Sequence, residues 1–436
     1  MPPATVRDIA DVLSQAGHEV WCVGGAVRDA LLGEPHLDWD LATSATPDVV
    51  RRLFRRTVPL GIEFGTVGVL DAAGTMHEVT TFRRDVQTDG RHAVVAFGVS
   101  LEDDLARRDF TINAIAVSPD GRRLADPFDG RGDLSRRVLR AVGEPSARMT
   151  EDRLRALRAL RFAARFDFTI AADTWTAIAA SAPHLGRLSA ERVKQEIEKT
   201  LEQVTQPSRA FRLWRAAEAF AVVAPALAGV ADAEWQAVDR VPRAPRGATP
   251  ARRARRRLER LAVMCAGLDP RAAGAMLKAL RFSNADQGWV LRIIAGVAAH
   301  RDAIARAVGG DMPVADQRRV ARHIAHDAGR LDATTVVRVA LVRAERPGDV
   351  ALVRAFYRVV RDAARHDPVA IGDLAIDGDD LRGLGAHGPA MGQVLRALLA
   401  EVLEEPARNA RAMLLDRAAA LLAAQAPRAE GSHASA

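Results

Sequence analysis

The sequence changes character near residue 145, and this change limits what the chain can fold into. Before it, short runs rich in β-branched residues, at 20–23, 65–70 and 77–82, predict strands, and residues 26–32 predict a helix. After Pro145, long amphipathic segments of arginine, alanine and leucine predict helices almost to the last residue. We therefore predict an α/β domain followed by an all-α remainder.

Composition narrows the class of protein. The chain has 436 residues, 48% of them hydrophobic and 27% charged, which excludes wholesale disorder and allows several domains. Its two cysteines, Cys22 and Cys265, are far apart among apolar neighbours, which favours neither a disulfide framework nor a cysteine zinc site. We find neither a signal-peptide pattern at the start nor a run of 18 apolar residues, so we expect a cytoplasmic protein that does not enter a membrane. The formal net charge of +7 permits a polyanionic partner such as nucleic acid.

Two adjacent glycines follow the first predicted strand, in the motif GGAVRD at residues 24–29. Bare backbone N–H groups at Gly24 and Gly25 could approach an anion, with Arg28 reaching back to it. Taken alone, the pair is better explained by a tight turn. The spacing matches neither the dinucleotide-binding G-x-G-x-x-G nor the P-loop motif, so it supports neither of those folds.

Two acids lie two residues apart in the segment LDWDL at residues 37–41. In an extended chain Asp38 and Asp40 share one face while Trp39 and Leu41 pack inward, and paired carboxylates of this kind suit Mg²⁺. A solvated loop is the alternative. Glu78, in the next strand-like run, offers a third carboxylate. Three such groups could hold two metal ions, an arrangement suited to in-line displacement at phosphorus.

These motifs occur in a familiar order. GGAVRD and DWDLAT are followed by HEVTTFR at 77–83, DGRH at 89–92, RRDFTINA at 107–114, the acids and arginines of 151–161, and LSAER at 188–192. Together they resemble the class II tRNA nucleotidyltransferase and bacterial poly(A) polymerase family, over roughly the first 205 residues. The resemblance implies a polymerase β-like nucleotidyltransferase head at 1–140, a helical neck at 141–206, and a helical body and tail at 207–436 that bind RNA.

The same resemblance implies roles for individual residues. Asp38, Asp40 and Glu78 would be catalytic and would coordinate two Mg²⁺ ions. Asp109 would accept a hydrogen bond from the ribose 2′-hydroxyl. The implied nucleotide-binding residues are Gly24, Gly25, Arg28, Arg108, Asp109, Asp152, Arg155, Arg158 and Arg161.

A helix expected at residues 151–165, capped by Thr150, would carry the base-reading pair. Asp152 and Arg155 would be neighbours at i, i+3 on it. A carboxylate only accepts and a guanidinium only donates, so the two together match the amine and ring nitrogen that cytosine and adenine both present. Uracil and guanine present the reverse pattern. An ordinary helix with intrahelical ion pairs is the alternative explanation.

The expected reaction is transfer of CMP and AMP from CTP and ATP to the tRNA 3′ end, with release of pyrophosphate. The uninterrupted segment 81–107 resembles a loop associated with A addition, which disfavours a CC-only enzyme. A poly(A) polymerase, or a catalytically silent RNA-binding relative, stays open as an alternative. The basic run at 251–257 could follow RNA phosphates or could be a solvated helix face. No obligate protein partner is indicated.

Overall fold

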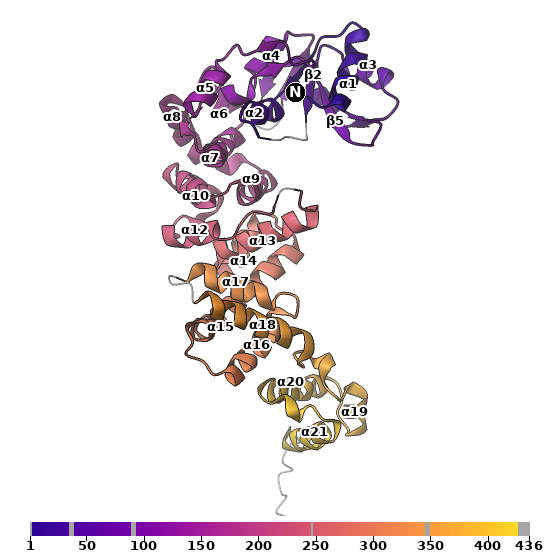
Figure 1. Ribbon diagram of the computed structural model, residues 1–436, viewed down its shortest axis with the longest axis vertical. Helices are drawn as coiled ribbons and strands as arrows, with labels where there is room; N and C mark the ends of the chain where they lie inside the picture. Colours follow the sequence, from indigo (N-terminus) through magenta and orange to yellow (C-terminus); the bar gives the residue numbers. More distant parts are fainter. Residues whose placement is uncertain (1, 35–38, 89–92, 246, 345–348, 426–436) are drawn as a thin grey trace, which may run out of the picture. The chain divides into compact units, whose positions relative to one another are not determined.

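The computed structural model describes residues 2–34, 39–88, 93–245, 247–344 and 349–425 (Figure 1). Asp38 and the DGRH motif at 89–92 therefore lie outside the described residues. Contacts divide the chain into two compact units, one of residues 1–239 with 279–281 and one of residues 240–278 with 282–436. The boundaries predicted near residues 140 and 206 fall inside the first unit and stay predictions.

The first unit contains a seven-stranded mixed sheet with the order β3-β4-β5-β2-β1-β8-β9. The strands of this sheet are β1 (Val20–Val23), β2 (Asp40–Thr43), β3 (Thr57–Pro59), β4 (Thr66–Leu70), β5 (Met76–Thr81), β8 (Ala116–Val117) and β9 (Leu124–Ala125). Within it β2 and β5 run parallel, and the other pairs are antiparallel. Two small sheets join β6 (Arg83–Thr88) to β7 (Ala93–Phe97) and β10 (Val138–Leu139) to β11 (Thr169–Ile170). The α/β prediction is confirmed.

Helices cover the sheet and continue beyond it. Those of the first unit are α1 (Ala4–Gln15), α2 (Gly25–Leu31), α3 (Pro47–Leu53), α4 (Leu101–Ala106), α5 (Gly130–Arg136), α6 (Pro145–Glu151), α7 (Leu154–Phe166), α8 (Ala172–Ser181), α9 (Ala190–Gln203), α10 (Pro207–Ala216), α11 (Ala219–Val223) and α12 (Asp232–Asp239). Trp21 and Val23 of β1 pack with Leu101 and Leu105 of α4 in a buried cluster. A capping box between Ser100 and Asp103 sets the residue at which α4 begins.

The helix predicted to start at Thr150 is different in the structure. Thr150 lies inside α6, which Glu144 caps, and its hydroxyl bonds the backbone oxygen of Ser146. The chain then leaves the helix at Asp152, whose φ of −148° and ψ of 105° are extended, and α7 begins at Leu154. The prediction of one continuous helix over 151–165 was therefore wrong. The reason is local, because the Asp152 carboxylate accepts the backbone N–H of Leu154 at 3.0 Å, a bond that competes with helix continuation.

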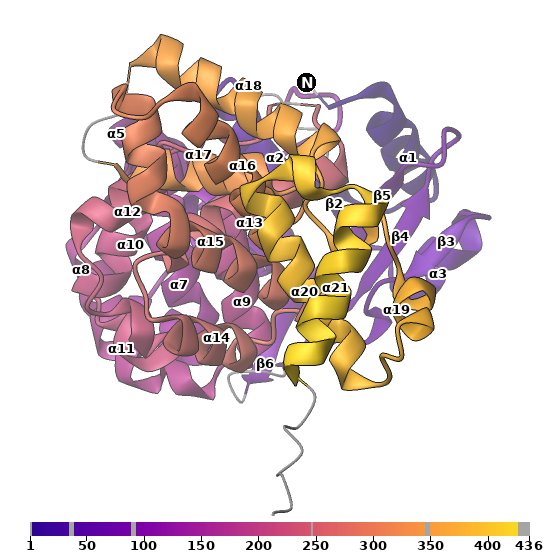
Figure 2. The same ribbon diagram turned by 90° about the horizontal axis from the view of Figure 1, so that it is seen from below.

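The second unit is helical through most of its described part. Its helices are α13 (Pro250–Cys265), α14 (Pro270–Ala279), α15 (Asn284–Gly309), α16 (Val314–Ala328), α17 (Ala333–Arg343), α18 (Val350–His366), α19 (Gly378–Gly383), α20 (Pro389–Glu404) and α21 (Arg411–Gln425). α18 packs against α15, α16 and α17, and α20 lies beside α21 in both views (Figure 2). None of the helices in the described ranges has the length and apolarity that crossing a bilayer requires.

Candidate active site

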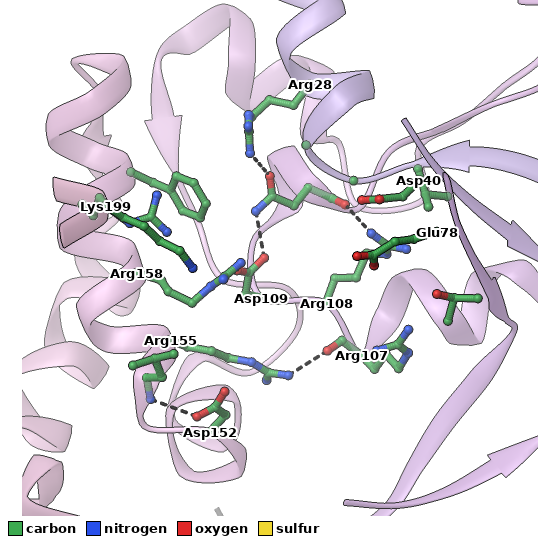
Figure 3. Close-up of a pocket in the computed structure, with 18 of the residues that line it drawn as sticks. Arg28, Asp40, Glu78, Arg107, Arg108, Asp109, Asp152, Arg155, Arg158 and Lys199 are labelled. Atoms are coloured by element: carbon green, nitrogen blue, oxygen red, sulfur yellow. Dashed lines mark hydrogen bonds and ion pairs between the residues drawn. The ribbon is translucent and has the colours of Figure 1, made fainter. Parts of the chain in front are cut away.

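A pocket of about 560 Å³ in the first unit collects the residues that the motifs singled out (Figure 3). Eleven of the twelve line it, namely Gly24, Gly25, Arg28, Asp40, Glu78, Arg108, Asp109, Asp152, Arg155, Arg158 and Arg161. The twelfth, Asp38, lies outside the described residues. Side chains from β1, β2, β5, α2, α7 and α9 therefore converge on one cavity, although they are spread over about 180 residues of sequence.

The turn after β1 needs its first glycine. Gly24 has a φ of 76° and a ψ of −140°, a backbone conformation that side chains other than glycine rarely adopt. A Cβ atom there would also lie 3.2 Å from Nη1 of Arg108 and 3.5 Å from Oδ2 of Asp40. The glycine thus lets an arginine and an aspartate of the pocket approach the backbone closely.

Asp40 and Glu78 are neighbours across two strands. Leu41 pairs with Val79 in the parallel register of β2 and β5, so the residues just before them lie side by side and on the opposite face from these two buried side chains. Both acids line the pocket. Within the described ranges no three histidine, cysteine or acidic residues gather as a metal site, and the aspartate predicted to complete this one is outside those ranges.

Arg108 forms the wall next to these acids. Its guanidinium bonds the carboxylate of Asp104 at 3.1 Å and the backbone oxygen of Asn113 at 3.4 Å. Burial raises the pKa of Asp104, but the charges of Arg107 and Arg108 outweigh this and lower it. The buried Nε of Arg108 has no hydrogen-bond partner within the described part of the chain, so the donor capacity of this arginine is not fully used.

Arg28 is more enclosed than its predicted role suggests. Its side chain is 3% exposed, and its guanidinium bonds Asp29 at 2.6 and 2.8 Å and the amide oxygen of Asn113 at 2.5 Å. It also lies over the rings of Phe162 and Phe166, at 5.2 and 4.6 Å from their centres. Burial lowers the pKa of Arg28, and the charge of Asp29 opposes that shift. Of its five N–H groups, two make no hydrogen bond within the described residues.

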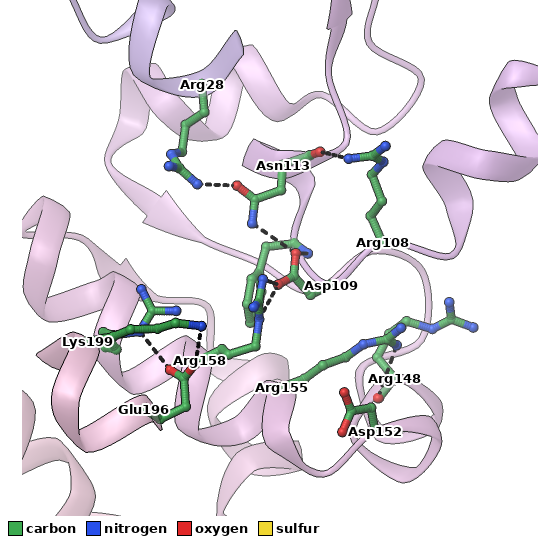
Figure 4. Close-up of polar contacts among 12 residues, drawn as sticks. Arg28, Arg108, Asp109, Asn113, Arg148, Asp152, Arg155, Arg158, Glu196 and Lys199 are labelled. Carbon is green, nitrogen blue, oxygen red and sulfur yellow. Dashed lines mark hydrogen bonds and ion pairs between the residues drawn. The ribbon is translucent and has the colours of Figure 1, made fainter. Parts of the chain in front are cut away.

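Asp109 is saturated with donors (Figure 4). One carboxylate oxygen accepts the backbone N–H of Phe110 and the amide of Asn113, both at 2.9 Å, and the other accepts Arg158 at 2.9 and 2.7 Å. Burial raises its pKa, but the charge of Arg158 and the bonds from Asn113 and Arg158 lower it to about 2. Asp109 is therefore a fixed negative charge at the centre of the pocket.

The predicted base-reading pair is not an intrahelical pair. Asp152 accepts a hydrogen bond from Arg192 of α9 at 2.7 Å, whereas Arg155 bonds Glu151 at 2.7 Å. Arg155 also donates to the backbone oxygens of Arg148 and Arg107, at 3.2 and 2.9 Å. Both side chains still line the same pocket, so the interruption before α7 moves their partners without separating them from the cavity.

Arg161 is held away from solvent. It is 3% exposed, and its Nε bonds the fully buried carboxylate of Glu196 at 2.7 Å. Burial lowers the pKa of this guanidinium, and the charge of Glu196 raises it. Lys199 approaches the other oxygen of Glu196 at 3.5 Å and is 43% exposed. The lysine, rather than Arg161, presents the accessible positive charge on this side of the pocket.

Several residues that line the pocket have no role implied by the sequence motifs. Asn113 lies inside RRDFTINA and joins Arg28 to Asp109, which only the folded contacts reveal. Lys199 is one of three lysines in the chain, a rarity that could have drawn notice. Arg192 belongs to the quoted LSAER motif, but its contact with Asp152 spans 40 residues.

A mixed sheet sets two carboxylates beside a cavity walled by arginines, which is the arrangement expected of a nucleotidyltransferase head. Residues 20–140 match the family described as Poly A polymerase head domain. Residues 167–230 match the family described as probable RNA and SrmB-binding site of polymerase A.

Similar proteins and solved structures indicate the enzyme more narrowly than the two domain families do. The CCA-adding enzyme of Limosilactobacillus fermentum is 35% identical over 439 residues, covering 96% of this chain and 97% of that one. The CCA-adding enzyme of Levilactobacillus brevis is 48% identical over 197 residues, 45% of this chain and 49% of that protein. A crystal structure of the Bacillus stearothermophilus CCA-adding enzyme in complex with CTP is 32% identical, with a TM-score of 0.77, and covers 96% of this chain and 98% of that chain.

The chain belongs to the family of CCA-adding enzymes, which are template-independent RNA nucleotidyltransferases. This confirms the resemblance inferred from the motifs. The match spans about half the length of several curated relatives, that of Levilactobacillus brevis among them, and nearly the whole length of the Limosilactobacillus fermentum enzyme.

Proposed function

We propose that this protein adds CMP and AMP from CTP and ATP to the 3′ end of tRNA, with release of pyrophosphate. The observation that carries the proposal is the pocket itself, in which Asp40 and Glu78 lie beside a wall of arginines. Its volume of about 560 Å³ is in the range of ligand sites, and its mixture of acids and cations suits a metal-bound triphosphate. The full-length relationship to a CCA-adding enzyme supports CCA addition over synthesis of poly(A).

Two neighbouring carboxylates supply the hard oxygen donors that a divalent cation prefers. In our proposal Asp40, Glu78 and Asp38 hold two Mg²⁺ ions. When bound, such ions lower the pKa of an attacking hydroxyl and balance negative charge on the triphosphate. Arg108, whose side chain is 18% exposed in the pocket, and Lys199 would contact phosphate oxygens.

The base would lie against Asp152 and Arg155. Each side chain can still form hydrogen bonds. The bonds described above leave two acceptor positions on the Asp152 carboxylate and two N–H groups on Arg155 unused. The first can accept an exocyclic amine and the second can donate to a ring nitrogen. Uracil and guanine would leave these groups without partners, at a cost of about 1 to 3 kcal/mol for each unpaired group.

The proposed contact between Asp109 and the ribose requires a change in the hydrogen bonds of Asp109. All four lone-pair positions of Asp109 already accept protein donors, so it can accept a 2′-hydroxyl only if one donor withdraws. Arg158 supplies two of the four, and its side chain is 31% exposed, so it is the donor that can move. Arg158 and the ribose hydroxyl would then share one oxygen of Asp109.

A gel assay tests the proposal directly. The full chain is incubated with Mg²⁺ and tRNA lacking its CCA end, together with CTP, ATP or both, and the extended ends are sequenced. We expect addition of CC with CTP alone and of CCA with both. Homopolymer A would instead indicate a poly(A) polymerase, and no Mg²⁺-dependent incorporation would indicate a catalytically silent relative.

A further inference from the structure

Helix α18 presents four arginines on one face. Arg354, Arg358, Arg361 and Arg365 are all exposed, whereas Phe356, Val360, Ala363 and Ala364 on the same helix are buried. At 100° per residue, the four arginines fall within an arc of about 60°, and the buried residues fall on the far side. We call these four residues the α18 arginine face. It extends about 16 Å along the helix, at a rise of 1.5 Å per residue.

These arginines are not neutralised by the protein. None of the four side chains makes a hydrogen bond or ion pair with any residue of the described ranges, including residues 349–425 around them. The one acid between Val350 and His366 is Asp362, and it is bound by Arg318 of α16 at 3.0 Å and by His366 at 2.9 Å. Four arginines against one aspartate leave this helix with a formal charge of +3.

The face borders a concavity. A cavity of about 370 Å³ between α16 and α18 is lined by Arg318, Arg358, Val359, Arg361, Asp362, Arg365 and His366. Three of the four arginines therefore lie at its edge, with cations on both helices. Such a groove concentrates positive potential and attracts an extended anion.

The basic run that stands out in the sequence behaves differently. In α13, Arg256 bonds Glu259 at 2.6 Å, Arg255 is ion-paired with Asp332, and Arg253 donates to the backbone oxygen of Ala248 at 3.0 Å. Much of the charge at residues 251–257 thus stabilises the second unit. The α18 arginine face has no such internal function to explain it.

The spacing and composition of the α18 arginine face favour a phosphate chain over a membrane surface as its partner. Residues at i, i+3 and i+4 have Cβ atoms about 5 to 6 Å apart, so their long side chains can reach consecutive phosphates. Each guanidinium can bind phosphate oxygens through two N–H groups. A membrane-surface helix would place large apolar side chains beside its cations. Between residues 354 and 365 no large apolar side chain is exposed.

We propose that the α18 arginine face binds the phosphate backbone of an RNA, independently of its base sequence. This inference rests on the proposed function in one respect, because the tRNA substrate of that function is the RNA we assign to the face. It adds a contact in the second unit, outside the pocket that holds the chemistry.

Binding of a fluorescein-labelled tRNA transcript lacking its CCA end, followed by anisotropy at several KCl concentrations, tests the proposal. In the full chain, R354Q/R358Q/R361Q/R365Q should raise Kd at least about tenfold at low salt. It should also reduce the slope of log K against log salt by about 1 for each phosphate that the variant no longer neutralises. The corresponding four-lysine variant keeps the charge and should retain most of the slope.

A matched control removes the same charge elsewhere in the second unit. Arg301, Arg382, Arg408 and Arg411 are exposed, and each is ion-paired with an acid, so R301Q/R382Q/R408Q/R411Q should change Kd less than about threefold. An equal loss of affinity in this control would overturn the proposal. So would an α18 variant with unaltered Kd and slope, or one that loses only the binding of a labelled polyglutamate peptide.

The readouts separate this inference from the proposed function. Incorporation of CMP is measured on the same preparations, and melting temperature shows that the variants are folded. If the wild type binds tRNA through α18 but incorporates nothing, the proposed function fails and this inference stands. If it incorporates CMP and the α18 variant binds as tightly as wild type, the function stands and this inference fails.

Discussion

The carboxylate of Asp152 accepts a hydrogen bond from the Arg192 guanidinium at 2.7 Å, across 40 residues of the chain. The same carboxylate accepts the backbone N–H of Leu154 where α7 begins. Its orientation therefore depends on two different helices, α7 and α9. Because Arg155 has separate partners, Asp152 and Arg155 can respond independently to mutation.

This independence gives a prediction about nucleotide choice. Arg155→Ala should relax discrimination against UTP and GTP and weaken use of CTP and ATP, because the donor to the ring nitrogen is removed. Asp152→Ala should act likewise through loss of the amine acceptor. Relative kcat/KM for the four nucleotides, on tRNA ending at each stage of CCA, measures both effects.

Arg192→Ala is the informative companion variant. It removes the side chain that orients Asp152 but leaves Arg155 in place, so it should alter base preference less than either of the other two variants. If all three variants lower activity uniformly and lower the melting temperature, with unchanged preference, the ion pairs are merely structural.

The strands and the acid pair could be predicted because their determinants are local. Short runs rich in β-branched residues locate β1, β4 and β5, and the two-residue period puts Asp40 and Glu78 on a common face once β2 and β5 are neighbours. The break at Asp152 could not be predicted in the same way. No proline or glycine at residues 146–160 marks the break, and the bond that orients the Asp152 carboxylate comes from Arg192, far along the chain.

The pairing of the arginines also could not be predicted from the sequence. Their number in the sequence conceals which are paired, and only the fold shows that Arg161 is buried on Glu196. The spacing of the α18 arginine face was visible in the sequence. Only the fold shows that Asp362 pairs with Arg318 and with none of the four arginines.

The acid pair predicts a loss of chemistry without loss of RNA binding. Asp40→Ala should nearly abolish nucleotide transfer while tRNA affinity changes little, because this carboxylate lies in the pocket of the first unit. Glu78→Ala should also be severe if Glu78 is a metal ligand, and a loss below about tenfold would give it an orienting role instead. Asp11→Ala, an exposed acid of α1, is the control and should be silent. Near-wild-type turnover of Asp40→Ala would refute the assignment.

Asp109 predicts a dependence of stability on pH. Its pKa is about 2 in the folded protein against an ordinary value of 3.8, so the unfolded state takes up the proton first as the pH falls. The stabilisation is present in full above about pH 5 and is lost between about pH 4 and pH 2. From the shift it is on the order of 2 kcal/mol.

Melting temperatures between pH 6 and pH 2.5 test this. Asp109→Asn keeps the shape but removes the titrating group, so its curve should fall less steeply below pH 4 than that of the wild type. Arg158→Gln should destabilise the protein at pH 7, because it leaves a buried carboxylate without its main counter-charge. Parallel curves for wild type and Asp109→Asn would contradict the low pKa.

The last prediction concerns Arg161, which the motifs assigned to the nucleotide and the fold buries against Glu196. Removing one partner of a buried ion pair leaves the other charge uncompensated, so Arg161→Met and Glu196→Gln should each destabilise the protein by about 3 to 5 kcal/mol. The double variant Arg161→Met/Glu196→Met should be less destabilised than the sum of the single changes, because neither charge is then left alone. Urea unfolding of the four proteins gives the coupling. If instead Arg161→Met melts like the wild type and raises KM for CTP and ATP, the guanidinium binds nucleotide and the pair with Glu196 contributes little to the fold.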